Sequence, residues 1–228
     1  MTFSLLAYDP NSRAWGGVAA TGSLCVGGWV LRGRAGVGLS ASQGYSPSTI
    51  WGNGALSMMA NGQSATQAVE SLVNADRGNA WRQLAALDRN GNTAAFSGEF
   101  NLDFKGHLAR NGLVASGNIL AGPQVLEAMV DALETGQQPF EDRLLAALDA
   151  GQKAGGDERG VQSAAMLVVR ENAPPLDLRV DWHETPIVAL GRLLEKTRRP
   201  DYRDWLKVTP TTSDPHRSPE VSGKTTGT

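Results

Sequence analysis

The chain has 228 residues, 41% of them hydrophobic and 19% charged, and its formal net charge is −2 at pH 7. These values are typical of a globular protein and give no electrostatic reason to expect a nucleic acid or an anionic membrane as a partner. The length favours one large domain over two small ones.

The N-terminus has no basic segment followed by an apolar one, and no apolar run is long enough to span a bilayer. We therefore expect a cytoplasmic protein. Cys25 is the single cysteine, which excludes an intrachain disulfide and a zinc site built from several cysteines. We interpret Cys25 as a small buried residue in a strand, with a reactive thiol as the alternative.

The first 42 residues predict short strands joined by tight turns. Apolar segments at 3–8 and 15–21 flank the turn sequence DPNSR and predict a hairpin, and strands are expected to continue at 26–31 and 35–42. Glycine, which tolerates tight turns and close backbone contacts, is concentrated in this part of the chain.

After these strands the spacing of apolar residues becomes helical. Two helices are predicted within SPSTIWGNGALSMMANGQSATQAVESLVNAD, and the second covers 65–74 with Ser64 as its N-cap. RQLAALDRNGNTAAFSG predicts a hairpin that turns at Asn90 and Gly91. A strand at 113–117 then leads into a helix at 123–134.

The last third of the chain predicts a helix, two strands and a final helix, in the segments PFEDRLLAALDAGQKAGG, QSAAMLVVRE, LDLRVDW and TPIVALGRLLEKTRR. From about Lys207 onward proline, serine, threonine and glycine replace large apolar residues, which predicts disorder. We therefore expect one domain over residues 1–206 and a disordered tail over 207–228. Groups of strands separated by paired helices favour an α+β fold, in which two stacked, mainly antiparallel sheets carry helices on both outer faces.

Several blocks of the sequence, in the same order, resemble a bacterial family called domain of unknown function 1028. The resemblance covers about residues 1–197 and rests on MTFSLLAYDP, GGVAATGSLCVGG, RAGVGLSASQGY, RQLAALDRNGNTAAFSG, the GH at Gly106 and His107, GNILAGPQVLEAM, GGDERGVQSAAMLVVR and LRVDWHETPIVALGRLL. Members of that family are placed by fold with the N-terminal-nucleophile (Ntn) hydrolases. The resemblance therefore implies a four-layer αββα sandwich, in agreement with the layers expected from the element order.

The resemblance also implies a role for Thr2 as a nucleophile. A hydroxyl needs a base, and an α-amine with a pKa of roughly 7.7–8.0 is partly unprotonated near neutral pH. Once Met1 is removed, as is usual before a small residue, Thr2 would carry both the hydroxyl and the amine. The alternative is that Thr2 simply begins a strand, for which threonine has a good propensity.

Charged residues that would assist such a nucleophile are missing from the early strands. Proteasome-type relatives place a lysine near the nucleophile, whereas the first lysine here is Lys105, and residues 15–42 contain no Asp, Glu or Lys. Arg32 and Arg34 lie on one face of a strand and are expected in solvent. Substrate binding would then rely on neutral polar side chains, for which the candidates are Thr21, Ser23, Ser42 and Gln43. Their alternative role is to satisfy backbone groups in a glycine-rich sheet.

Two loops supply the other candidate site residues. In SGNILAGP, Gly117 and Asn118 end a strand, and the loop at 119–122 leads into a helix N-terminus, so backbone and side-chain N–H groups could stabilise an oxyanion there. An ordinary turn is the alternative. In GGDERGVQS, Asp157 and Arg159 are candidates to bind a substrate carboxylate or amine, or to form a structural ion pair.

The sequence predicts no metal and no cofactor. Asp181 and His183 share a strand face, but no third ligand has the spacing of a zinc motif. GRAGVG lies within a strand and has no following helix, so we do not interpret it as a phosphate loop.

Two hypotheses follow. The first is an amidohydrolase in which Thr2 attacks a small amide or amino-acid derivative. The second is a non-catalytic protein of the same fold that binds a small molecule or serves assembly. In either case apolar residues in the exposed helix segment IWGNGALSMM predict a homodimer.

Overall fold

The computed structural model describes residues 2–156 and 160–219, and two antiparallel sheets form its centre. The larger sheet has six strands in the order β10-β9-β2-β1-β8-β7. Its strands are β1 (Thr2–Asp9), β2 (Ala14–Thr21), β7 (Gly106–Arg110), β8 (Leu113–Asn118), β9 (Ser163–Arg170) and β10 (Ala173–Val180).

The smaller sheet has four strands in the order β3-β4-β5-β6, namely β3 (Leu31–Arg34), β4 (Gly38–Gln43), β5 (Gln83–Asp88) and β6 (Thr93–Ser97). The hairpin predicted around Asn90 and Gly91 is confirmed as β5 and β6. Gly91 has a φ of 81°, which explains why a glycine stands at this turn.

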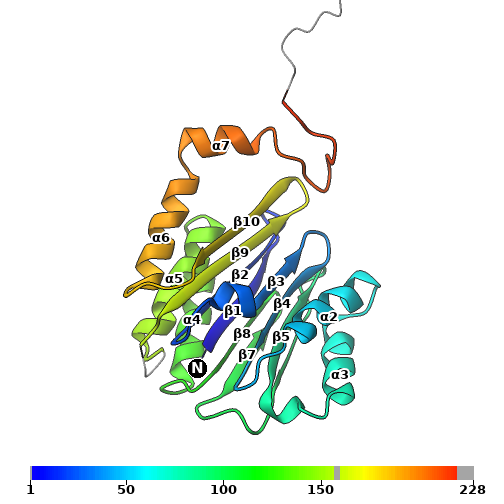
Figure 1. Cartoon of the computed structure of the whole chain (residues 1–228), viewed down its shortest axis with the longest axis vertical. Coiled ribbons are helices and arrows are strands. Elements are labelled where there is room, and N and C mark those ends of the chain that lie inside the picture. The colour runs from blue at the N-terminus through cyan, green and yellow to red at the C-terminus, as the bar shows by residue number, and fades with distance from the viewer. Residues whose placement is uncertain (1, 157–159, 220–228) are drawn as a thin grey trace, which may run out of the picture.

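Helices cover both outer faces of the stacked sheets (Figure 1). On the larger sheet lie α4 (Gln124–Thr135), α5 (Phe140–Lys153) and α6 (Pro186–Thr197), and on the smaller sheet lie α2 (Thr49–Ala60) and α3 (Ala65–Ala75). The short elements α1 (Val26–Trp29), η1 (Asn79–Trp81) and α7 (Pro200–Leu206) complete the order. The predicted α+β fold with four αββα layers is therefore confirmed.

The alternation of residues along β1 explains the two buried layers. Phe3 and Leu5 are fully buried among side chains of α4 and α5, while Leu6 points the other way into the apolar layer between the sheets. Because side chains alternate across a strand, Thr2 and Ser4 share the inter-sheet face with Leu6. The first strand thus carries polar residues at its beginning and apolar residues at its centre on the same face.

The strand predicted at 26–31 is wrong. Residues 26–29 form the single helical turn α1, and β3 begins only at Leu31. A turn this short depends on tertiary packing, and here Gly27 lies so close to β9 and β10 that a Cβ would approach Ala165 to 2.9 Å. Cys25 is accordingly not in a strand: it precedes α1 with a φ of 59° and is only half-buried.

Part of the C-terminal segment packs against the β9–β10 turn. Helix α7 follows α6, and the structure describes the segment predicted to be disordered as far as residue 219. Within it, Thr211 is buried and the Ser213 N–H donates to the Glu171 carbonyl in the β9–β10 turn. The assignment of residues 1–206 as one complete domain stays a prediction.

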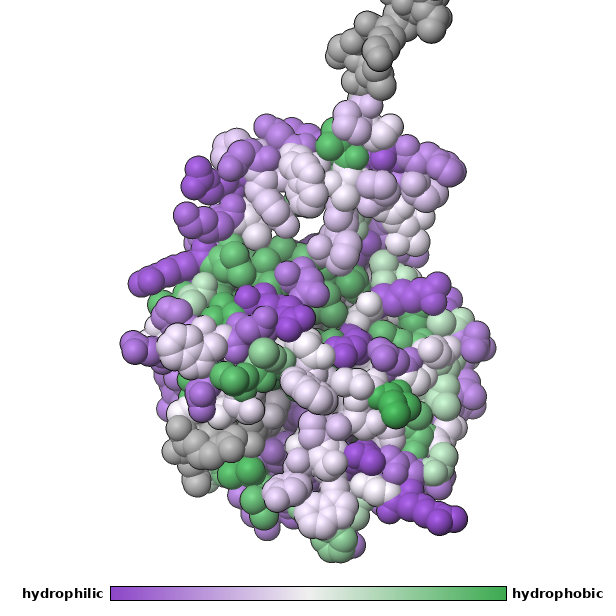
Figure 2. All heavy atoms as spheres, in the orientation of Figure 1, coloured by the Kyte–Doolittle hydropathy of each residue, from purple (hydrophilic) through white to green (hydrophobic). Residues whose placement is uncertain are grey.

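The molecular surface is mixed. Figure 2 shows hydrophobic residues in separate patches over the strands, with hydrophilic residues dominating near α7. In residues 2–156 and 160–219, no helix combines the length and the apolar character needed to cross a membrane.

Candidate functional site

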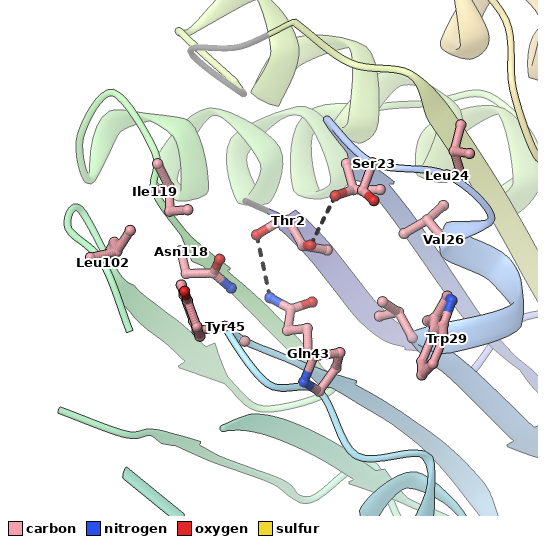
Figure 3. A pocket seen from close by; sticks show the side chains of 14 residues that line it. Thr2, Ser23, Leu24, Val26, Trp29, Gln43, Tyr45, Leu102, Asn118 and Ile119 are labelled. Carbon is pink, nitrogen blue, oxygen red and sulfur yellow. Dashed lines mark hydrogen bonds between the residues drawn. The ribbon is translucent and has the colours of Figure 1, made fainter. Parts of the chain in front are cut away.

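A pocket of about 600 Å³ opens at the end of the sheets where β1 begins (Figure 3). Its floor is made of the buried neutral polar side chains of Thr2, Thr21, Gln43 and Asn118, and the exposed Ser23 also lines it. Its walls are mainly apolar and come from Leu24, Val26, Trp29, Val30, Tyr45, Pro47, Leu102 and Ile119. Five of the candidate residues that the sequence placed on separate segments therefore line one cavity.

Strand register brings the three central residues together. Thr2 pairs with Thr21 on β2 and with Asn118 on β8, so the three form one row across the larger sheet. In an antiparallel sheet directly opposed residues project to the same face, and here that face is the one covered by the smaller sheet. The beginning of β1 thus lies between two polar neighbours at the pocket floor.

Thr2 is held at two points. Its side-chain Oγ1 donates to Thr21 Oγ1 at 3.1 Å, and its carbonyl accepts from Gln43 Nε2 at 3.4 Å. Figure 3 draws both bonds, with the side chains of Thr2, Gln43 and Asn118 pointing toward one another. Thr2 is 9% exposed, so its hydroxyl is largely shielded from bulk solvent yet lines the cavity.

Gln83 on β5 fixes the orientation of the side-chain amides below the pocket. Its Nε2 donates to the carbonyls of Gly117 at 2.9 Å and Gly106 at 3.0 Å, and to Ser97 Oγ at 2.8 Å. Backbone carbonyls can only accept, so the nitrogen end of this amide must face them. The oxygen end of Gln83 is therefore turned toward the pocket.

That oxygen in turn orients two residues of the pocket floor. Gln83 Oε1 accepts from Gln43 Nε2 at 2.8 Å and from Asn118 Nδ2 at 3.1 Å. Gln43 must then present its own oxygen to Ser4, whose hydroxyl donates to it at 2.8 Å. The side chains of Gln83, Gln43, Asn118 and Ser4 are all at least 98% buried. Their donors and acceptors match in a single orientation of the amide groups. Asn118 keeps a second N–H on Nδ2.

Two predicted site residues do not line the pocket. Ser42 lies on the opposite face of β4 from Gln43 and donates from Oγ to the Ser48 carbonyl at 2.7 Å, against α2. Gly117 faces away from the cavity, because a Cβ there would meet Leu120 at 2.6 Å. Both corrections follow from strand alternation: neighbours in sequence project to opposite faces. Gly117 contributes only its carbonyl, to Gln83.

The first two backbone donors after Asn118 are already occupied. The Ile119 N–H donates to the Leu102 carbonyl at 3.0 Å and the Leu120 N–H to the Phe104 carbonyl at 2.9 Å. These bonds tie the loop to the segment before β7. The side-chain amide of Asn118, which lines the pocket, is a candidate donor for an oxyanion. Asp157 and Arg159 lie outside the described residues.

The sequence of residues 2–190 matches a family described as a family of unknown function, DUF1028. The chain belongs to this family. It is also 49% identical to a DUF1028 protein from Silicibacter pomeroyi, whose crystal structure superposes with a TM-score of 0.91 over 95% of this chain and 98% of the other.

Two more distant structures are also similar to this DUF1028 chain. HslV from Trypanosoma brucei is 14% identical, with a TM-score of 0.44 over 74% of this chain and 99% of that one. Anbu, an ancestral beta-subunit from Yersinia bercovieri, is 9% identical, with a TM-score of 0.36 over 87% and 98%. Both scores are below 0.5, and neither likeness supports an argument here. No curated protein matches the sequence.

The DUF1028 pocket has supporting residues that the sequence did not single out. Ser163 on β9 donates from Oγ to the Ser23 carbonyl at 2.8 Å and accepts from the Val26 N–H at 3.1 Å, and Gln162 Nε2 donates to the Gly22 carbonyl at 2.9 Å. These bonds hold the loop between β2 and α1 that carries one pocket wall. Because Ser163 pairs with Thr21, knowledge of the register alone would have identified it.

Charge is scarce around the DUF1028 pocket. Among the described lining residues Tyr45 has the only ionisable side chain, and Lys105 forms an ion pair with Asp103 at 2.9 Å outside the lining. His107 contacts the outer end of the amide chain through Ser97, with Nδ1 and Oγ 3.2 Å apart, and partial burial lowers the pKa of its ring. Within 2–156 and 160–219, no group of three or more His, Cys, Asp or Glu side chains could hold a metal ion.

Proposed function

We propose that this DUF1028 protein is an amidohydrolase of the Ntn type, with Thr2 as its nucleophile after removal of Met1. The observation that carries the proposal is that the hydroxyl of Thr2, at the beginning of a central strand, lines the floor of a cavity large enough for a small amide. The family resemblance found from the sequence points to the same residue. A buried threonine serving only as a strand end would not require such a cavity.

The reaction needs no group beyond those of Thr2, Asn118 and water. The free amine of Thr2 takes the proton of its hydroxyl as Oγ1 bonds to the amide carbon. The carbon–nitrogen bond then breaks, the amine returns the proton to the departing amine product, and an ester remains on Oγ1. Water, deprotonated by the same amine, hydrolyses this ester and restores Thr2.

Asn118 is the proposed oxyanion donor. Its second N–H is held in place by the bond that the first makes to Gln83, and a preorganised donor stabilises developing charge without reorganising. Thr21 is a positioning residue, because its Oγ1 lies 3.1 Å from Thr2 Oγ1 and holds that oxygen in place; the Thr2 hydroxyl turns its proton from Thr21 to the amine before the attack. Loss of one oxyanion donor typically lowers kcat by about 100-fold to 1,000-fold.

Intact-mass spectrometry followed by assay of variants tests this function. The purified protein is expected to lack Met1 and to hydrolyse members of a panel of small amides. Thr2→Ala is expected to abolish hydrolysis, whereas Thr135→Ala, which removes an exposed threonine hydroxyl at the end of α4, is expected to leave it intact. A protein that keeps Met1, or a Thr2→Ala variant that still hydrolyses the amides, would disprove the proposal.

A second function is a non-catalytic binding module that uses the same pocket for a small molecule. The scarcity of charge among the described lining residues favours it, because no Lys or acid stands beside Thr2 to assist catalysis. Ligand binding that is unchanged in Thr2→Ala, together with no hydrolysis by the wild-type protein, would support this alternative.

We also propose that the protein forms a homodimer. Ile50 on α2, within the segment whose apolar residues predicted association, is 77% exposed. Light scattering during size-exclusion chromatography would give the mass directly, and a monomer at all concentrations would disprove the dimer.

A further inference from the structure

Three exposed aromatic rings stand in a row beside the pocket. The ring centroids of Tyr45 and Trp81 are 5.3 Å apart and those of Trp81 and Phe100 are 5.0 Å apart. The side chains are 64%, 42% and 49% exposed, respectively. We call these three residues the aromatic platform.

The backbone below the platform is fixed by one buried side chain. Asn101, which is 3% exposed, accepts from the Tyr45 N–H at 2.8 Å and donates from Nδ2 to the carbonyls of Arg82 and Gly98, both at 2.9 Å. A single amide therefore joins the three segments that carry the rings. The exposed rings are held on an ordered base and are not the ends of free loops.

Backbone contacts strengthen this base. The Ser46 N–H donates to the Trp81 carbonyl at 3.1 Å, and the Phe100 N–H donates to the Ala80 carbonyl at 2.8 Å. Gly44 permits the close approach: a Cβ there would lie 2.8 Å from the Trp81 carbonyl oxygen. Ordering this backbone costs conformational entropy, and the exposed rings gain little hydrophobic stabilisation in return.

The platform is continuous with the pocket. Tyr45 belongs to both, since its ring lines the cavity and packs against Trp81. Leu102, 53% exposed, lies two residues beyond Phe100 and also lines the cavity. Figure 1 shows the loop before β7 at the lower edge of the molecule, and Figure 2 shows pale, weakly polar surface at that end.

We propose that the aromatic platform binds a flat, uncharged aromatic group of the substrate, while the reacting amide occupies the pocket. The inference rests on the proposed function. Its basis is that ordered, exposed rings, tilted by 49° and 54° to one another, offer faces and edges to another aromatic ring. The described residues that line the pocket include no Lys, Arg, Asp, Glu or His, so the pocket itself offers no salt bridge to a charged substrate. The preferred substrate class is thus an aryl-bearing neutral amide that is longer than the pocket.

Calorimetric binding of N-(2-naphthyl)acetamide to the uncleaving Thr2→Ala variant tests the platform. N-cyclohexylacetamide, which carries an apolar group that is not flat, is the comparison compound. The naphthyl amide is expected to bind more tightly, and Trp81→Ala added to Thr2→Ala is expected to weaken its binding about tenfold. Trp205→Ala is the matched control, because Trp205 on α7 is 57% exposed and lies outside the platform.

Tyr45→Ala and Trp81→Phe extend the test if Trp81→Ala folds poorly. Tyr45→Ala is expected to weaken naphthyl binding, and Trp81→Phe, which keeps a ring, is expected to retain most of it. Equal binding of both compounds, or no loss in Trp81→Ala and Tyr45→Ala, would overturn the inference. A change of oligomeric mass in Trp81→Ala would also overturn it, because the rings would then form a contact between copies. Since binding is measured without cleavage, failure of the platform is distinguishable from failure of Thr2 as a nucleophile.

Discussion

At the scale of single residues, the orientation of buried amides decides what the pocket presents to a ligand. The side-chain amides of Gln43 and Asn118 each have an oxygen end and a nitrogen end. The backbone carbonyls of Gly106 and Gly117 fix the orientation of Gln83, and Gln83 in turn fixes the orientation of these two amides. A residue that does not line the cavity therefore controls two that do. Nothing in the local sequence QLAALD distinguishes this glutamine from a surface one.

Replacing Gln83 with leucine tests that control. Gln83→Leu removes the partner of two backbone carbonyls and two side-chain amides, those of Gly106, Gly117, Gln43 and Asn118. We therefore expect the free energy of unfolding to fall by about 3 kcal/mol. Ligand binding at the pocket is expected to weaken as well, because Asn118 loses its anchor. Urea denaturation and calorimetry measure the two effects. Gln137→Leu, at an exposed loop position, is the control, and equal stability of the two variants would contradict the expectation.

The lowered pKa of His107 predicts a pH dependence of stability. Burial disfavours the charged ring, so the unfolded chain binds more protons than the folded one below about pH 6.5. Stability is therefore expected to fall as the pH is lowered from about 6.5 toward the folded-state pKa. His107→Gln should reduce this slope in urea denaturation measured at several pH values. NMR titration of the ring provides an independent check, and a pKa at or above the usual value would contradict the expectation.

At the scale of elements, local sequence signals succeed where an element carries its own stabilising contacts. Helix α3 has a complete capping box, in which Ser64 Oγ accepts from the Gln67 N–H and Gln67 Oε1 accepts from the Ser64 N–H. Helix α1 has no side-chain cap, and strand β7 lies at an edge and was not predicted. Both depend on neighbours far away in the chain.

The capping box gives a prediction for α3. Ser64→Ala removes one acceptor from the first turn and is expected to destabilise the protein by about 1 kcal/mol. Ser57→Ala is the matched control, because Ser57 lies inside α2, is exposed, and bonds only to the Asn53 carbonyl of its own helix. Thermal or urea denaturation compares the two. Equal losses would mean that the Ser64 cap contributes nothing specific.

At the scale of the whole molecule, stacking of the two sheets builds the site. The row Thr21, Thr2 and Asn118 on the larger sheet lies against the pair Gln43 and Gln83 on the smaller one. Hydrogen bonds join the two rows at this end of the core: Asn118 Nδ2 donates to Gln83 Oε1, and Gln43 Nε2 donates to the Thr2 carbonyl. At this end of the core the buried polar side chains satisfy one another, and Thr2, Gln43 and Asn118 also line the pocket.

Removal of residues 207–228 tests the domain boundary. The buried residues of the three apolar clusters lie between Phe3 and Leu194, so a chain of residues 1–206 is expected to fold with one cooperative transition. Its melting temperature should fall by only about 2–4 °C. Circular dichroism during heating measures both. Loss of a cooperative transition would show that the end of the chain belongs to the domain.

The sequence alone was sufficient for the fold class, most of the strands and helices, the family resemblance, and the candidates Thr2, Thr21, Ser23, Gln43 and Asn118. Turn residues, helix caps and apolar periodicity are local signals, and they act through contacts between neighbours in the chain. Tertiary structure decided that Ser42 faces a helix, that the N–H of Ile119 is occupied, and that Gln83 and Asn101 organise the pocket and its aromatic border. The physical reason is that register and sheet stacking join residues that are far apart in the chain, such as pairs separated by 39 and 112 positions, and a hydrogen bond between such residues leaves no trace in the composition of either segment.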